Sequence, residues 1–248
     1  MHRFFVETPI VNQHEIIIPK DIRHQLINVL RSNVGDKIIL FDNSGWEYVT
    51  ELKNIRKNNI VGLIIDKQKK LSELSIKISL YQPILKSDKF EFILQKGTEL
   101  GISNFVPIFC DRSIKRWDYD QIIDLKYPRW KKIITEASEQ SERGKIPCLS
   151  NPLNFTDAIN SSKENIINII ALTEKNTQKL KEILNSNIQI KYNEIGLFTG
   201  PEGGFTKKEI DLAKSSGVKP ISLGNRILRA ETATLISITS ILIQSGEL

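Results

Sequence analysis

From about residue 75 onward, the chain alternates between strand-like and helix-like patterns of apolar residues. IKISLYQP and NFVPIF are short β-rich runs, whereas DKFEFILQKGTELG and YPRWKKIITEASEQSER repeat their apolar residues with a helical period. The alternation continues through IINIIALT, NTQKLKEILN, GLFTGPEGGFTKKEI, PISLG and a last helix from about Ala230. Because strands separated by helices pair in parallel, this order predicts an α/β domain with a mainly parallel sheet.

The first 70 residues have a different pattern. HEIIIP, DKIILFD, EYVTELK and NIVGLIID are short β-rich runs between turn residues, and DIRHQLINVLR is a single helix-like piece. This pattern predicts a small β-barrel or half-barrel. The charged, weakly apolar stretch KQKKLSEL, residues 67–74, suits a linker. We therefore expect two domains, covering residues 1–71 and 72–248.

Composition narrows the class of protein. A chain of 248 residues that is 40% hydrophobic and 26% charged is typical of a soluble globular protein, and no apolar run is long enough to span a bilayer. MHRFFVETPI lacks the apolar core of a secretory signal, so we expect a cytoplasmic protein with no membrane partner. The net charge of +6 favours a polyanionic partner, because lysine and arginine neutralise phosphates.

Metal and hydrolase chemistry have no visible basis in the sequence. Its two cysteines, Cys110 and Cys148, lack the spacing of metal ligands, and all three histidines fall within the first 24 residues. We therefore expect neither a metal site nor a Ser/His/Asp triad.

The stretch GLFTGPEGGFTKKEI, residues 196–210, predicts a strand, a glycine-rich loop and a helix. Gly200 and Pro201 end the strand, and Thr206 with Glu209 has the form of a capping box, so a helix should begin at about Lys207. Ligands of open α/β sheets bind at the carboxyl ends of strands, and glycines let them approach the backbone. A ligand loop and a plain tight turn both remain open. The loop lacks the glycine spacing of a dinucleotide-binding motif or a P-loop.

A second strand, glycine loop and helix start follow in ISLGNRILRAETA, residues 221–233. We expect the two loops to follow neighbouring strands and to form two walls of one pocket. The last helix, ETATLISITSILIQ, is apolar on most faces, which predicts burial in the domain core or partly against a second subunit.

TGPEGGF together with LGNRILRAETA resembles the signature of the RsmE-type ribosomal RNA uridine-N3 methyltransferases of the SPOUT class. HRFF, VLR, KGTELGI, RW and EASEQSER extend the resemblance over nearly the full length. It implies an N-terminal PUA-like β-barrel that binds RNA, a C-terminal SPOUT α/β domain threaded into a trefoil knot, and a homodimer. Ser138 and Glu142 depart from the pattern, since small residues are more usual at these positions.

The resemblance also implies S-adenosylmethionine as methyl donor and N3 of a uridine in 16S ribosomal RNA of the small subunit as acceptor. It assigns the cofactor site to residues of the two loops and of the strand IINIIALT. These residues are Leu172, Thr199, Gly200, Pro201, Gly203, Gly204, Leu223, Gly224, Ile227, Leu228 and Thr232. For Leu223 and Leu228, simple core packing is the alternative.

Uracil N3 carries a proton, so the protein must remove this proton or stabilise the anion that its loss leaves behind. Arg229 is the candidate for stabilising the anion, because a guanidinium stays charged and its fork can meet a carbonyl oxygen. Glu231 and Glu202 are the candidate bases, and either could instead cap a turn or pair with an arginine. Arg3, Arg31, Arg112, Arg116 and Arg143 are candidate RNA phosphate contacts, with a solvated or structurally paired arginine as the alternative for each.

Two other functions remain open from the sequence. One is a different RNA methyltransferase of the knotted class. The other is an RNA-binding ribosome assembly factor without catalysis, and the two intact glycine loops argue against it.

Overall fold

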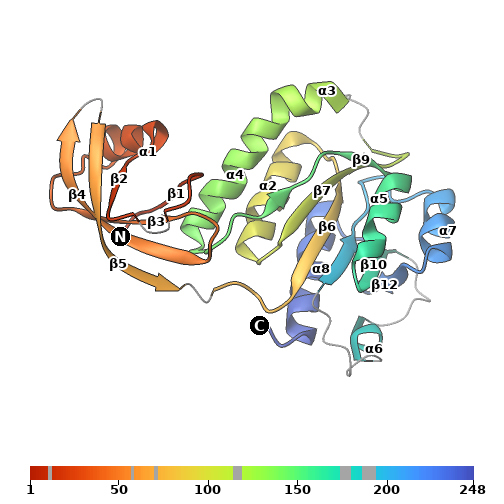
Figure 1. Ribbon diagram of the computed structural model, residues 1–248. Coiled ribbons are helices and arrows are strands. Elements are labelled where there is room, and N and C mark those ends of the chain that lie inside the picture. The colour runs from red at the N-terminus through yellow and green to blue at the C-terminus, as the bar shows by residue number, and fades with distance from the viewer. Residues whose placement is uncertain (11–12, 57–58, 70–71, 114–118, 174–179, 186–193) are drawn as a thin grey trace. The chain divides into compact units, whose positions relative to one another are not determined.

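The computed structural model describes residues 1–10, 13–56, 59–69, 72–113, 119–173, 180–185 and 194–248 (Figure 1). It divides into two compact units. The N-terminal unit comprises Met1–Glu73 and Ser138–Ile146, and the C-terminal unit comprises Leu74–Ala137 and Pro147–Leu248. None of the helices in these described ranges has the length and apolar character that crossing a membrane requires.

The N-terminal unit is built on a five-stranded sheet with the order β1-β3-β4-β5-β2. β1 pairs with β3 in parallel, and the other neighbours are antiparallel. The strands are β1 Arg3–Phe5, β2 Glu15–Ile17, β3 Lys37–Phe41, β4 Trp46–Arg56 and β5 Asn59–Lys69. The predicted helix forms as α1 Lys20–His24, which continues into the wider π-turn η1 Gln25–Val29.

Alternating side chains form the core of this unit. Ile38 and Leu40 of β3 are fully buried with Leu52 of β4 and Ile60 of β5, and α1 and η1 add Ile22 and Leu26. This burial at every second position is what a sheet with one covered face requires. Between the described parts of β1 and β2 no pairing closes the sheet, so the half-barrel alternative describes it better than a closed barrel.

The predicted linker at residues 67–74 is wrong in its first part, because β5 extends to Lys69. Lys67 pairs across the sheet with Tyr48, and its ammonium lies 4.3 Å from the ring centre of Trp46. A lysine that places its charge over an aromatic ring and its stem along the sheet can continue a strand despite its polarity.

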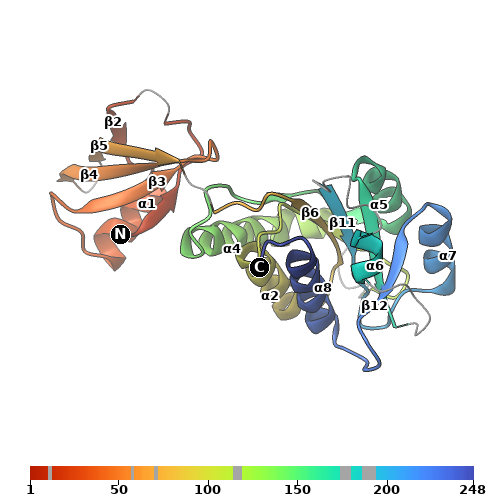
Figure 2. The same ribbon diagram turned by 90° about the horizontal axis from the view of Figure 1, so that it is seen from below.

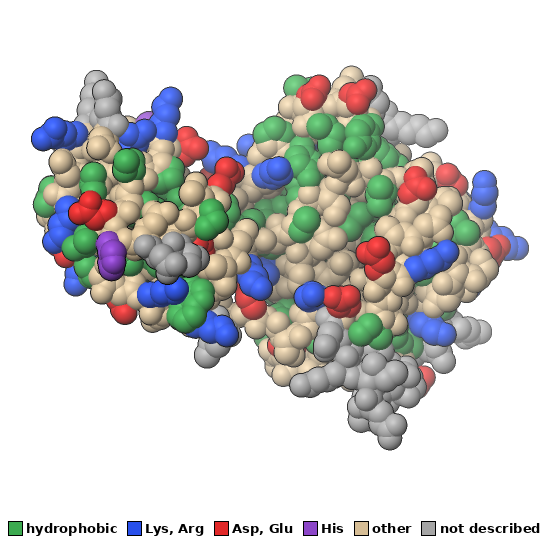
Figure 3. Space-filling view, in the orientation of Figure 1, with side chains coloured by type: hydrophobic (Ala, Val, Ile, Leu, Met, Phe, Trp, Pro, Cys, Tyr) green, Lys and Arg blue, Asp and Glu red, His purple; other side chains and the backbone are tan. Residues whose placement is uncertain are grey.

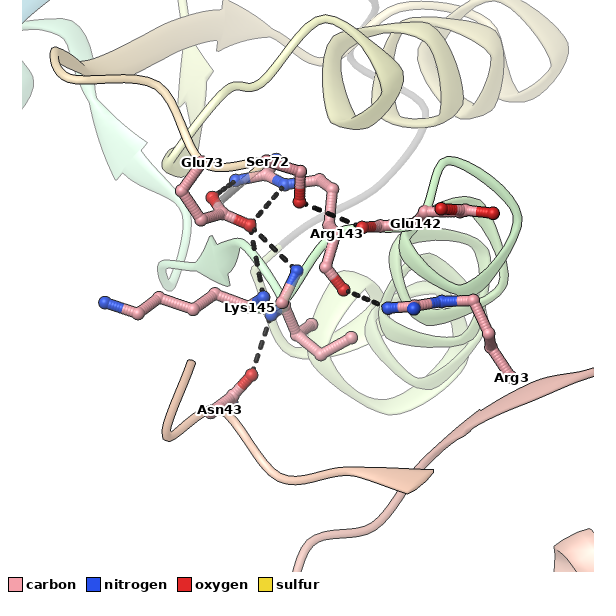
Figure 4. Close-up of polar contacts among 9 residues, drawn as sticks. Arg3, Asn43, Ser72, Glu73, Glu142, Arg143 and Lys145 are labelled. Atoms are coloured by element: carbon pink, nitrogen blue, oxygen red, sulfur yellow. Dashed lines mark hydrogen bonds and ion pairs between the residues drawn. The ribbon is translucent and has the colours of Figure 1, made fainter. Parts of the chain in front are cut away.

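The segment Ser138–Ile146 returns to the N-terminal unit and is held there by polar contacts (Figure 4). The carboxylate of Glu73 accepts from the guanidinium of Arg143 at 2.7 Å and from the backbone N–H groups of Gly144 and Lys145 at 3.1 Å. Arg3 donates to the Arg143 carbonyl at 2.9 Å and forms an ion pair with Glu47. No signal in the sequence indicated this return of the chain.

The same segment explains the two departures from the family pattern. Ser138 is fully buried, and its carbonyl accepts from the backbone N–H of Arg143 at 3.0 Å, so a small side chain is required there. Glu142 has a φ of 58°, in the left-handed region that favours glycine. A non-glycine residue in this conformation costs roughly 1–2 kcal/mol.

The C-terminal unit is an α/β fold around a parallel sheet with the order β12-β10-β11-β6-β7-β8, and β9 pairs with β7. The strands are β6 Lys77–Pro83, β7 Asn104–Phe109, β8 Cys148–Leu149, β9 Leu153–Asn154, β10 Ile167–Leu172, β11 Glu194–Phe198 and β12 Lys219–Ser222. The helices are α2 Ser87–Glu99, α3 Tyr119–Gln121, η2 Ile122–Lys126, α4 Tyr127–Gln140, α5 Phe155–Ser161, η3 Ser162–Glu164, α6 Leu180–Asn185, α7 Lys207–Ser215 and α8 Ala230–Gln244.

Helices cover both faces of this sheet (Figures 1 and 2). α2 and α8 pack together on one face, and α5 and α7 pack together on the other. Tyr81 of β6 and Phe198 of β11, which are register partners, stack with ring centres 4.2 Å apart, and Phe155 of α5 packs against Phe198. The predicted mainly parallel α/β fold is confirmed in this unit.

The predicted ends of several helices are also confirmed. α2 ends at Glu99 and Gly101 follows with a φ of 89°, as expected for a glycine that terminates a helix. α8 begins at Ala230. Ile238, Ile241 and Leu242 of α8 are buried within the unit, whereas Ile236 and Ile243 are 39% and 54% exposed. Most of the large apolar side chains in the second half of this helix therefore pack into the core of the unit, and two isoleucines remain partly exposed.

Candidate active site

The first glycine loop, residues 199–206, connects β11 to α7 and is fixed where α7 begins. The predicted capping box is present. The backbone N–H of Thr206 donates to the Glu209 carboxylate at 2.7 Å, and the Thr206 hydroxyl accepts from the Glu209 N–H at 3.3 Å. Glu209 is buried and also accepts from the N–H of Asp111 at 2.9 Å. The entry to α7 is therefore held by one carboxylate that accepts from two backbone N–H groups.

The second glycine loop, residues 223–229, connects β12 to α8. The expectation that the two loops follow neighbouring strands is wrong, because β10 lies between β11 and β12. Ile170 of β10 pairs with Phe198, and Leu172 pairs with Ser222. Since the three strands are parallel, their carboxyl ends meet at one edge of the sheet. Leu172 at the end of β10 thus lies between the two loops.

Both glycine loops contain backbone that a ligand could approach closely. Gly204 has a φ of 68° and Gly224 a φ of 104°, and no atom lies within 4 Å of where a Cβ would stand at either position. The backbone N–H groups of residues 225–228 donate no hydrogen bond to another described residue. Backbone donors seldom stay unpaired unless water or a ligand serves them. These residues fit a ligand rich in acceptors, such as the S-adenosylmethionine implied by the resemblance.

The apolar members of the set differ in exposure. Leu172 and Pro201 are buried, Leu223 and Leu228 are half-buried, and Ile227 is 89% exposed. A large apolar side chain so exposed beside open backbone suits an adenine ring, which needs an apolar surface. Thr232, in the first turn of α8, is exposed.

Gly203 is constrained by a neighbour. A Cβ at this position would stand 3.2 Å from the Cβ of Arg112, and the Arg112 guanidinium donates to the Gly203 carbonyl at 3.0 Å. A side chain at Gly203 would therefore displace Arg112. This close approach of Arg112 was not evident from the sequence.

A buried polar network joins the first loop to α8. Gln82, at the end of β6, accepts through its Oε1 from the hydroxyl of Thr199 at 2.7 Å and from that of Thr234 at 2.9 Å. All three residues are at most 1% exposed. Sequence analysis missed Gln82 and Thr234. The signal available was a glutamine at the end of an otherwise apolar strand, where an acceptor must serve a partner.

The two candidate bases share one lysine. Lys89, in the first turn of α2, places its ammonium 3.4 Å from Glu202 Oε1 and 3.6 Å from Glu231 Oε2. Glu231 Oε2 is buried and accepts no hydrogen bond within the described part of the chain, so this ammonium is its neighbour by charge alone. Glu202 of the first loop and Glu231 of the first turn of α8 thus lie beside the same ammonium, as a common site requires.

Arg229 is the residue that precedes α8, with an exposed side chain. Among the described residues, its guanidinium has no hydrogen-bond or ion-pair partner. The structure therefore does not show the alternative in which Arg229 pairs with Glu202 or Glu231. Both carboxylates form an ion pair with Lys89 instead.

The arginines proposed for RNA fall into two groups. Arg31 and Arg112 are exposed, while Arg3 and Arg143 are buried and paired with carboxylates, which leaves little of either guanidinium for a phosphate. Arg116 lies outside the described residues. On the face drawn in Figure 3, the blue lysine and arginine side chains of the N-terminal unit are spread around its outline and form no single patch.

Two family models match the chain. Residues 72–242 match an RNA methyltransferase domain, and residues 18–65 match an RNA methyltransferase PUA domain. Together these matches cover most of the chain. The PUA match lies in the N-terminal part of the chain, and the methyltransferase match covers most of the rest.

Individual proteins are similar over nearly the whole length. The ribosomal RNA small subunit methyltransferase E of Bacillus subtilis (strain 168) is 33% identical over 251 residues, which cover 99% of this chain and 97% of that protein. The protein of the same name from Buchnera aphidicola subsp. Schizaphis graminum is 32% identical over 236 residues, which cover 94% of this chain and 92% of that protein. The crystal structure of a ribosomal RNA small subunit methyltransferase E from Neisseria gonorrhoeae, bound to S-adenosyl methionine, superposes with a TM-score of 0.87 at 29% identity, covering 98% of this chain and 97% of that one.

Proposed function

Since the chain belongs to the family of the ribosomal RNA small subunit methyltransferases E, we propose that it transfers a methyl group from S-adenosylmethionine to N3 of a uridine in 16S ribosomal RNA. The family and its cofactor support methylation of ribosomal RNA, in agreement with the resemblance read from the sequence. The choice of uridine N3 rests on the loop motifs TGPEGGF and LGNRILRAETA.

The observation that carries the proposal is the open edge of the C-terminal sheet. Two glycine loops flank Leu172 there, with left-handed glycines at 204 and 224 and unpaired backbone donors at residues 225–228. The backbone of residues 199–204 and 223–228 would hold the cofactor, and Leu172, Leu223 and Leu228 would face its apolar part.

When bound, S-adenosylmethionine supplies a methyl group on a sulfonium, so catalysis consists largely of placing the uracil nitrogen in line with it. The protein must then deal with the N3 proton. Arg229 has an exposed guanidinium without a partner in the described chain, which suits it to meet a uracil carbonyl as negative charge develops. Glu231 and Glu202 stay the candidate proton acceptors, held beside one another by Lys89.

The N-terminal unit is proposed to position the RNA. Its match to the PUA domain of RNA methyltransferases supports this role, and the exposed Arg31 is a candidate phosphate contact within it. In the C-terminal unit, the exposed Arg112 beside Gly203 would place a positive charge next to the cofactor loop. The trefoil knot implied by the family stays part of the proposal.

The protein is further proposed to act as a cytoplasmic homodimer on the small ribosomal subunit. Ile236 and Ile243 are partly exposed on α8, whose other isoleucines at positions 238 and 241 are buried. These two isoleucines are seven residues apart and so lie on one face of the helix, and this face is proposed to contact the second copy.

The proposal is tested with small subunits and free 16S ribosomal RNA from a strain that lacks this modification. Purified protein and S-adenosylmethionine should produce 3-methyluridine, identified by mass spectrometry of digested nucleosides. Methylation at another atom or base would contradict the N3 assignment, and cofactor binding without methylation of any ribosomal RNA would indicate a non-catalytic role.

A further inference from the structure

Lys89 is a charged residue for which neither the loop motifs nor the chemistry of methyl transfer provides a role. It lies in the first turn of α2, on a segment that neither glycine loop includes. Nevertheless, its ammonium contacts a carboxylate from each loop region, Glu202 after β11 and Glu231 at the start of α8. One side chain therefore links three segments that are far apart in the sequence.

Lys89, Glu202 and Glu231 are partly buried, which strengthens the electrostatic interactions between their side chains. The side chains of Lys89, Glu202 and Glu231 are 26%, 33% and 18% exposed, so solvent screens their interactions only in part. Neither carboxylate forms an ion pair with any other described residue. Without the ammonium, two negative charges would face each other, one of them on an oxygen that accepts no hydrogen bond.

The position of the two carboxylates ties them to the cofactor site. Glu202 is bracketed by Gly200 and Gly203 in the first loop, and Glu231 follows the second loop by two residues. α2 packs against α8, so Lys89 is carried on a helix that is already fixed to the element bearing Glu231. The first loop is fixed at its two ends, by the bond of Thr199 to Gln82 and by the capping box at Thr206. Repulsion between the carboxylates would therefore act on the middle of the loop, where Glu202 lies.

We propose that Lys89 is a positioning residue whose ammonium offsets the repulsion between Glu202 and Glu231 and thereby holds the first glycine loop against the start of α8, in the arrangement that binds S-adenosylmethionine. The inference rests on the proposed function for the identity of the ligand. It assigns Lys89 no contact with cofactor or RNA.

The test is calorimetric titration of the full-length protein with S-adenosylmethionine, with circular dichroism to confirm folding. Lys89→Met keeps the apolar stem and removes the charge, and should weaken binding by roughly tenfold. Lys89→Arg keeps the charge and should bind nearly as well as the wild type. Lys86→Met is the matched control, because Lys86 is exposed at the same end of α2 and forms no ion pair with a described residue.

The decisive variant removes the repulsion instead of restoring the lysine. In Lys89→Met/Glu202→Gln only one carboxylate remains, so binding should recover most of what Lys89→Met lost. Glu202→Gln alone is titrated beside it as the reference, so that the recovery is measured against the effect of losing this carboxylate by itself.

If the double variant bound S-adenosylmethionine no better than Lys89→Met, the inference would be overturned. That result is expected if Lys89 contacts the cofactor directly, because removing the carboxylate of Glu202 cannot replace such a contact. Unchanged binding in Lys89→Met would overturn it as well while leaving the proposed function intact. A wild-type protein that does not bind S-adenosylmethionine would instead remove the proposed function itself.

Discussion

The Thr199 hydroxyl donates to Gln82 Oε1 at 2.7 Å, although 117 residues separate the two in the chain. This bond joins the end of β11, where the first glycine loop begins, to the end of β6. Thr234 of α8 shares the same acceptor at 2.9 Å. A single buried amide therefore fixes the first loop to the helix that follows the second loop.

We expect Gln82→Leu to destabilise the protein by about 1–3 kcal/mol, because Thr199 loses its buried acceptor, whereas Thr234 can still donate to the Ala230 carbonyl at 3.0 Å. Denaturant unfolding measures this change. The triple variant Gln82→Leu/Thr199→Val/Thr234→Val leaves no hydroxyl without an acceptor and should recover part of the loss. A triple variant less stable than Gln82→Leu would contradict this account.

Arg229→Lys should slow methyl transfer without weakening cofactor binding. The variant keeps a positive charge but loses the planar fork, and removing one well-placed donor costs on the order of a hundredfold in rate. Single-turnover rates at saturating S-adenosylmethionine measure the effect, and a rise in pH should partly rescue it because more uracil is then ionised.

Arg226→Lys is the matched control for Arg229, since Arg226 is an exposed arginine of the same loop. It should leave the rate nearly unchanged. A normal rate with poor cofactor affinity in Arg229→Lys would show that Arg229 shapes the loop and does not act on the uracil.

Gly204→Ala should weaken S-adenosylmethionine binding more than its effect on stability explains. Gly204 and Gly217 both have positive φ, at 68° and 85°, with open space where a Cβ would stand. Alanine at either position should cost about 1 kcal/mol of stability through backbone strain. Gly217 follows α7, outside both glycine loops, so Gly217→Ala should bind the cofactor normally in calorimetry. Equal affinities for the two variants would remove Gly204 from the site.

Ile236→Glu should dissociate the proposed homodimer, because Ile236 is 39% exposed on α8 and a carboxylate there would be buried by a second copy. Light scattering across a concentration series measures the state of assembly. Ile238→Glu should instead unfold the C-terminal unit, since Ile238 is fully buried within it. A wild-type protein that is monomeric at assay concentrations would refute the dimer.

The two cysteines should differ in reactivity. Cys110 is buried, and this burial, reinforced by the negative charge of Glu209, raises the pKa of its thiol well above the usual range, so the reactive thiolate is suppressed. Cys148 is exposed. A disulfide reagent at pH 8 should therefore titrate one thiol in the native protein and two after denaturation. Two rapidly reacting thiols in the native state would mean that the core around Cys110 opens readily.

Local patterns in the sequence determined the fold class and the start of the key helices. The capping box of Thr206 and Glu209, the start of α8 at Ala230 and the terminating Gly101 depend on residues close together in the chain. Such signals are readable because a helix end must satisfy its own backbone groups. The family followed from two loop motifs for the same reason, since each is contiguous.

The tertiary structure alone decided which distant residues meet. Sequence patterns identified Glu202 and Glu231 as candidates, but the ammonium that joins them belongs to Lys89 on α2, and the acceptor of Thr199 belongs to Gln82 on β6. The position of β10 between β11 and β12, and the return of Ser138–Ile146 to the N-terminal unit, had no local signal either. Strand order and long-range ion pairs arise from how elements pack, and the pattern that forms an element carries little information about its partner.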